Sequence, residues 1–265
     1  MPILLVRDDP RCRLEICSGV RETDEPCYRP GSLVPRGDWR PIEETTERGR
    51  TWDRYEGGRC LHENLALVRV MDGSALAEAS GFECGPGQQG WRINWGMALE
   101  QLEAVCKRLC ADSPIEHKGR WLAKGGGISL STTWDRNDGN LTGLHIDRWE
   151  RRPVGSSSSA RNRVCLNLGP RSRYLVFVGI DLMELAARHG IDGTGLFMTS
   201  HAQTYLRQHP MTPVYRLRIE PGEAYVAPTE CLIHDGQASS TEGEWVHTVF
   251  GRFAATNEAR FLSVV

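Results

Sequence analysis

His145 and Asp147 stand two positions apart in the segment Leu144-His145-Ile146-Asp147, where an apolar run ends. In an extended strand, residues two apart point to the same side, so this imidazole and this carboxylate could bind one ion together. Imidazole plus carboxylate is a ligand set that suits a divalent iron. The alternative is a hydrogen-bonded His–Asp pair at the end of a strand. No other His-x-Asp or His-x-Glu spacing occurs in the sequence.

An iron site of this kind needs one more imidazole from a distant part of the chain, and His234 is our first candidate. It follows a turn, a β-type run and a proline, and it ends a short apolar run just before Asp235-Gly236. The alternative is a histidine that belongs to a turn. His247 is the rival ligand, but it lies inside the last β-type run, where a histidine more often forms part of a core wall.

With these residues in place, the chain resembles the iron(II)/2-oxoglutarate-dependent oxygenases. That family has a double-stranded β-helix with His-x-Asp at the end of one strand and a second His near the end of a later one. The resemblance covers residues 128–253 and implies that His145, Asp147 and His234 hold iron(II), with 2-oxoglutarate and O2 as cosubstrates. The implied reaction couples decarboxylation of 2-oxoglutarate, to succinate and CO2, to oxidation of a C–H bond, with hydroxylation as the default.

A basic residue is expected to bind the distal carboxylate of 2-oxoglutarate, because a buried carboxylate needs a charged partner. Many family members use an Arg shortly after the second His, but here the first Arg in that region, Arg252, comes late. Other branches take the cation from a strand after His-x-Asp, where this chain offers Arg163. We rank Arg163 and Arg252 equally as the anchor. Thr248, and Asn167 on the strand face of Arg163, are further candidates for cosubstrate binding.

Two polar loops, residues 134–138 and 148–152, should lie near the mouth of such a site. Trp134 and Arg148 are our candidates for substrate binding, with ordinary surface polarity as the alternative. By analogy at the level of the fold, we expect a small polar metabolite, such as an amino acid or a natural-product intermediate. Two rival functions remain: a cupin-like metal enzyme that does not use 2-oxoglutarate, and a metal-free barrel that binds a metabolite.

The elements that must position these residues are mostly short β-type runs. Separated by Gly, Pro and Ser clusters, the runs cover residues 128–134, 141–149, 164–168, 174–180, 214–219, 223–226, 231–234 and 245–253. Helices are predicted at residues 97–109, 182–188 and 194–208. We therefore expect one α+β domain over residues 1–265, with a jelly-roll or cupin-like core at 128–253. Residues 61–127 would give helical support, and residues 1–60 an irregular extension.

The composition agrees with a globular protein whose partner is a small molecule. The 265 residues carry a net charge of −2, from 32 basic and 34 acidic residues, so we expect neither nucleic acid nor membrane as a partner. This near-neutral charge also argues against a nucleic-acid or histone demethylase. Nine cysteines without a Cys-x-x-Cys pair predict no disulfide framework. We expect a cytoplasmic protein that could form a homodimer through residues 1–60.

Overall fold

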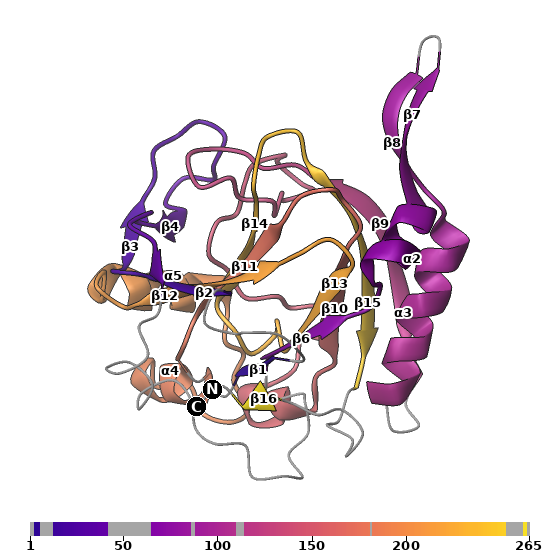
Figure 1. Ribbon diagram of the computed structural model, residues 1–265. Helices are drawn as coiled ribbons and strands as arrows, with labels where there is room; N and C mark the ends of the chain where they lie inside the picture. The colour runs from indigo at the N-terminus through magenta and orange to yellow at the C-terminus, as the bar shows by residue number, and fades with distance from the viewer. Residues whose placement is uncertain are drawn as a thin grey trace.

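The computed structural model describes residues 3–5, 13–41, 65–85, 88–109, 114–180, 182–252 and 262–263. Its fold is α+β, with two main sheets and helices on both outer sides (Figure 1). Among the described residues, no helix has both the length and the apolar character that a membrane crossing requires. Of residues 1–60, through which a homodimer was expected, the structure describes 3–5 and 13–41, and the dimer contact stays a prediction.

The larger sheet has seven strands, most of them antiparallel. Their order is β16 (Leu262–Ser263), β1 (Ile3–Leu5), β6 (Leu65–Arg69), β13 (Glu223–Ala227), β10 (Asn162–Asn167), β15 (Glu244–Gly251) and β9 (Glu116–Ala123). The smaller sheet has the order β14 (His234–Ala238), β11 (Arg173–Val178), β12 (Val214–Ile219), β2 (Leu14–Cys17) and β5 (Arg40–Pro41). Two hairpins complete the strands: β3 (Val20–Glu22) with β4 (Leu33–Pro35), and β7 (Ser80–Gly85) with β8 (Gln88–Ile93).

The chain passes back and forth between the two sheets. β9, β10, β13 and β15 belong to the larger sheet, whereas β11, β12 and β14 belong to the smaller one. The segment around His145 joins the smaller sheet through a single bridge to His234. These eight segments follow the course of a jelly roll. The fold class expected from the sequence is therefore the one observed.

The interior of the barrel lies between the two sheets and is filled from both. Cys165 and Tyr225 of the larger sheet share a buried cluster with Leu175 and Phe177 of the smaller one. Because side chains alternate along a strand, the neighbouring residues of β10, such as Val164, point to the outer face instead. The inward-facing positions are therefore those that can line a site.

Helices cover both outer faces. α3 (Trp95–Leu109) packs Leu102 and Val105 on the outer face of the larger sheet, beside the short helix α2 (Gly73–Ala79). α4 (Leu182–Arg188) and α5 (Thr199–Gln208) pack Leu185 and Leu206 on the outer face of the smaller sheet. A short 3-10 helix, η3 (Val154–Ser159), precedes β10. Figure 1 shows α3 on one side of the barrel and α4 and α5 on the other.

Three features differ from the sequence-based expectation. The segment expected to give helical support, residues 61–127, also contains strands β6 to β9. The sequence pattern missed β9 because the exposed side chains of this edge strand show no apolar alternation. Residues 13–41 are not irregular but supply β2 to β5, and Leu14 and Ile16 of β2 point into the interior. The runs 128–134 and 141–149 form turns and isolated bridges rather than strands.

Candidate metal centre

Three buried side chains converge at one end of the barrel. Each of His145, Asp147 and His234 offers a ligand atom, and these atoms lie within 4.8 Å of one another. Nε2 of His145 is 3.7 Å from Oδ1 of Asp147, and Nε2 of His234 is 3.6 Å from Oδ2. The structure thus brings together the three residues chosen from the sequence.

Backbone hydrogen bonds hold these residues in place. The amide of His145 donates to the carbonyl of His234 at 2.9 Å, and the amide of His234 donates back at 2.8 Å. The amide of Asp147 donates to the carbonyl of Thr229 at 3.1 Å. His234 therefore begins β14 rather than ending a strand, which corrects the expected boundary without moving the residue out of the site.

Both imidazoles have one nitrogen tied to the backbone and the other free among the described residues. Nδ1 of His145 donates to the carbonyl of Gly143 at 2.7 Å, and Nδ1 of His234 donates to that of Leu232 at 2.9 Å. With Nδ1 protonated, the neutral ring presents the Nε2 lone pair. Gly143 makes this possible, because it has a φ of 67° and would place a Cβ 2.6 Å from the carbonyl oxygen of Leu33.

Asp147 is held in its charged form by its neighbours. Burial opposes the charge, but the guanidinium of Arg163 and the two imidazoles together outweigh it and lower the pKa of Asp147 to about 2. Nη2 of Arg163 is 2.7 Å from Oδ2, without the alignment of a hydrogen bond. Burial, together with the nearby His145, lowers the pKa of His234 to about 3, so this ring is neutral near pH 7.

The donor set fits a divalent transition metal. Nε2 of both histidines and Oδ2 of Asp147 are buried atoms with no hydrogen-bond partner in the described part of the chain. Buried polar atoms are normally satisfied, so three orphans that face one another indicate a missing partner. Two neutral imidazoles and a carboxylate on one side of an ion leave its other positions open, as in a 2-His-1-carboxylate iron site.

His247 is excluded as the rival third ligand. It lies on the outer face of β15, and its Nε2 is 3.1 Å from Nδ1 of His117 on β9. Nε2 of His117 is in turn 3.3 Å from a carboxylate oxygen of Glu103 on α3. The alternation of β15 turns His247 toward α3 and its neighbour Thr248 into the barrel.

The residues expected to bind the cosubstrate have different surroundings in the structure. Thr248 is buried beside Cys165, and its hydroxyl has no partner among the described residues, so it is placed to serve a ligand. The amide of Asn167 donates to the carbonyls of Arg171 and Ile219, and its oxygen accepts from Gly169, so this side chain fixes a turn instead. Arg252 is exposed beyond the end of β15.

The sequence-based interpretation missed Arg173. This first residue of β11 is buried inside the barrel, where its Nη1 is 3.6 Å from Sγ of Cys165 and its Nη2 is 3.4 Å from Oγ1 of Thr132. No carboxylate of the described residues lies within ion-pairing distance of it. Arg173 alternates with Leu175 and Phe177, both inward-facing, and that alternation was the available signal.

The two residues expected to bind substrate occupy the loops at the barrel's mouth. Trp134 is 43% exposed, and its indole N–H donates to the carbonyl of Lys124 at 3.4 Å. Arg148 follows Asp147 directly and donates to the carbonyl of Arg152 at 3.0 Å. Neither contact assigns a substrate role, so both residues remain predictions.

Comparisons with known proteins found similar solved structures, among them the following two. No family model and no curated protein matches the chain. The first structure is the Kdo hydroxylase KdoO, a non-heme Fe(II) α-ketoglutarate-dependent dioxygenase in complex with succinate and Fe(III). It is 11% identical, with a TM-score of 0.39, and the match covers 73% of this chain and 80% of that one. The second is HygX from Streptomyces hygroscopicus with nickel, 2-oxoglutarate and hygromycin B. It is 15% identical, with a TM-score of 0.31, covering 74% of this chain and 89% of that one.

Proposed function

We propose that this protein is an iron(II)/2-oxoglutarate-dependent oxygenase that hydroxylates a C–H bond of a small polar metabolite. The observation that carries the proposal is the donor set of His145, Asp147 and His234, two imidazoles and a carboxylate whose ligand atoms lie close together and lack hydrogen-bond partners among the described residues. That set suits iron(II) and leaves positions for a cosubstrate and O2.

The protein's part in the reaction is to hold and orient the reactants. When bound, iron(II) with 2-oxoglutarate supplies the oxidation of a C–H bond by O2, with release of succinate and CO2. His145, His234 and Asp147 hold the metal, and the carbonyls of Gly143 and Leu232 keep each Nε2 lone pair turned toward it. Arg163 keeps Asp147 ionised.

We assign the distal carboxylate of 2-oxoglutarate to Arg173. Its guanidinium lies beside Gly236, two residues beyond His234 on β14, where an added Cβ would be 3.4 Å from Nη2. A buried guanidinium without a carboxylate partner is costly, and a ligand carboxylate would remove that cost. Arg163 is committed to Asp147, which leaves Arg173 as the inward-facing Arg available to the cosubstrate.

Arg173 also favours the oxygenase over the two rival functions. A cupin-like metal enzyme that binds no keto acid would not need the unpaired guanidinium of Arg173 inside the barrel. A metal-free barrel would not need two histidines that lack hydrogen-bond partners at Nε2. A dicarboxylate that reaches from the metal toward Arg173 accounts for both features at once.

The direct test is the release of succinate from 2-oxoglutarate by the purified protein, with and without iron(II). We expect iron-dependent release, and we expect none from His234→Ala. Iron uptake without succinate would indicate the cupin-like alternative. Failure to retain any divalent metal would indicate the metal-free barrel.

A further inference from the structure

A narrow hollow opens beside Asp147 at the mouth of the barrel. Its lining residues come from the loop after Asp147, the start of β10, the loop before β14 and the end of β15: Trp149, Glu150, Arg161, Thr229, Glu230 and Phe250. The carbonyl of Thr229 accepts the backbone hydrogen bond from Asp147, so the hollow adjoins the metal centre directly. The hollow is too tight to hold a whole molecule, so only one end of a substrate could reach it, with the remainder beside the metal centre.

Most charges around this hollow are already matched. Glu150 pairs with Arg152 and, at 2.5 Å, with Arg161. Asp147 pairs with Arg163 at 2.7 Å. Glu150 therefore has no remaining need for an outside cation, and Asp147 is taken up by Arg163 and the metal centre.

Glu230 is the exception. Its side chain is 4% exposed, and one carboxylate oxygen accepts from the backbone amide of Glu150 at 2.6 Å. The other oxygen, Oε2, is buried with no hydrogen-bond partner in the described part of the chain. Burial raises the pKa of Glu230, and Arg148 opposes that only from a distance, because its guanidinium donates to the carbonyl of Arg152 and forms no ion pair with Glu230.

Aromatic rings complete the hollow. Trp149, which is 54% exposed, and the buried Phe250 have ring centroids 5.8 Å apart. A ring face attracts cations, and Arg163 already lies 5.9 Å from the Trp149 ring and 5.7 Å from the Phe250 ring. Lys118 and Arg161 also lie 5.2 Å and 5.8 Å from the Phe250 ring, so the exposed Trp149 is the ring that a cation from solvent can reach.

We propose that Glu230 binds a protonated amino group of the substrate, which makes the substrate class a primary amine whose carbon skeleton lies next to the metal. An ammonium group supplies both the hydrogen-bond donor and the positive charge that Oε2 lacks. A neutral hydroxyl would supply the donor alone. This inference rests on the proposed function, since it names the substrate class of the same site.

The test is calorimetric titration of the iron(II)- and 2-oxoglutarate-loaded protein, without O2, with a panel of amines. The panel contains amino acids, amino sugars and diamines, each beside its N-acetyl counterpart. We expect at least one free amine to bind about 10- to 100-fold more tightly than its N-acetyl form. Glu230→Gln should abolish that preference, and Glu230→Asp should keep part of it. Glu242→Gln, which removes a carboxylate beyond the other end of β15, should keep it fully.

The proposal is overturned if no amine binds better than its N-acetyl form, or if Glu230→Gln keeps the preference while the protein remains folded. Iron uptake and succinate release are measured separately on the same samples. A protein that prefers amines but takes up no iron would keep the amine-binding role of Glu230 and lose the proposed function. A protein that releases succinate but shows no preference for amines would support the proposed function and overturn the amine-binding role of Glu230.

Discussion

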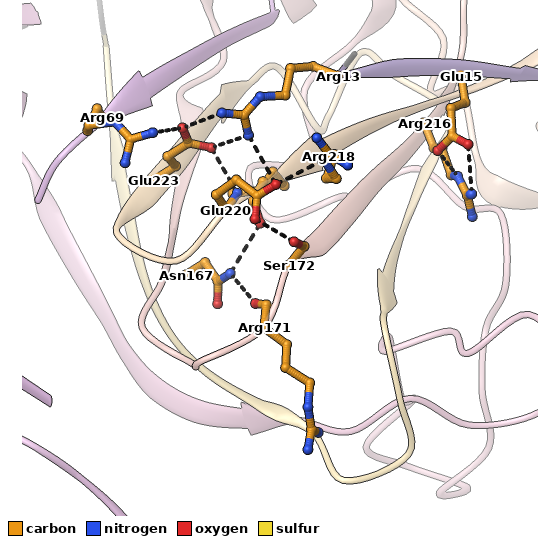
Figure 2. A network of polar contacts seen from close by, with 11 residues as sticks. Arg13, Glu15, Arg69, Asn167, Arg171, Ser172, Arg216, Arg218, Glu220 and Glu223 are labelled. Carbon is orange, nitrogen blue, oxygen red and sulfur yellow. Dashed lines mark hydrogen bonds and ion pairs between the residues drawn. The ribbon is translucent and has the colours of Figure 1, made fainter. Parts of the chain in front are cut away.

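Two buried carboxylates near opposite ends of β13 have very different surroundings. Glu223, at the start of the strand, is bound by Arg13 through two hydrogen bonds of 3.0 and 3.1 Å and by Arg69 at 2.7 Å (Figure 2). It also accepts from the amide of Glu220 at 2.8 Å. Asp147, beside the loop that follows the strand, faces one guanidinium and two imidazoles and has an oxygen without a hydrogen bond.

The difference distinguishes a structural cluster from a binding site. Around Glu223 the polar groups satisfy one another and tie β2, β6 and β13 together, so nothing is left for a ligand. Around Asp147 the backbone fixes the metal-ligand atoms in place, but these atoms lack hydrogen bonds. Burying them this way costs free energy, and a bound metal would offset that cost. Burial and charge alone would not have separated the two.

The largest effect is expected from the loss of a ligand at the unsatisfied site. His234→Ala should reduce iron(II) retention from one ion per chain to none and abolish turnover, because two ligands rarely hold iron. His247→Ala is the matched control, and it should retain both. Metal analysis of the two purified variants checks this. Iron retained by His234→Ala and lost by His247→Ala would place the centre elsewhere.

The satisfied cluster should respond in stability instead. Glu223→Gln removes the charge that holds Arg13 and Arg69 and should lower the free energy of unfolding by about 3 kcal/mol, as expected when one partner of a buried pair is removed. Iron(II) stoichiometry should not change. Urea unfolding measures the effect, and a loss below about 1 kcal/mol would give this cluster no more weight than a surface ion pair.

Arg173 tests the same distinction, because it is buried and has no carboxylate partner among the described residues. Arg173→Met should raise the dissociation constant of 2-oxoglutarate by roughly 30- to 1000-fold, the equivalent of about 2–4 kcal/mol. Unlike Glu223→Gln, it should leave the metal-free protein at least as stable as before, since it removes an uncompensated charge. Arg252→Ala is the control for 2-oxoglutarate binding. If Arg252→Ala weakens 2-oxoglutarate binding more than Arg173→Met does, then Arg252 and not Arg173 binds the distal carboxylate.

The His117–His247 pair should give the smallest effect, in the pH dependence of stability. Burial, aided by His117, lowers the pKa of His247 to about 4, below the value of about 6.5 expected in the unfolded chain. The unfolded state therefore binds more protons between these values, so stability falls as the pH drops from about 6.5 to 4. His247→Gln should reduce that slope in urea unfolding. Identical slopes would mean that His247 does not titrate with folding.

The metal residues could be chosen from the sequence because their signal is local. His145 and Asp147 share one short segment, and His234 stands directly before the Asp235-Gly236 pair. Helix α3 was predictable for the same reason, from apolar residues at helical spacing. What could not be predicted was the assembly around them. Whether Arg163 or Arg173 is already paired depends on contacts between the sheets, and no spacing along the chain records those.

The misassigned segments have a physical cause as well. Residues 128–134 and 141–149 have β-type composition, but Leu130 and Gly143, one in each run, adopt positive φ values of 49° and 67° and turn the chain there. β9 lies at the edge of its sheet, with most of its side chains exposed, so it lacks the apolar alternation of an inner strand. In both cases tertiary pairing outweighs local composition.

The central claim is that His145, Asp147 and His234 hold a metal to which 2-oxoglutarate binds. The most direct measurement is calorimetric titration of 2-oxoglutarate into the protein without O2, with and without iron(II). We predict one binding site and an affinity for 2-oxoglutarate at least about 100-fold higher when iron(II) is present. Without iron, Arg173 would be the one point that binds 2-oxoglutarate, and the metal would add a second. Equal affinity in the two titrations, or no binding in either, would contradict the account.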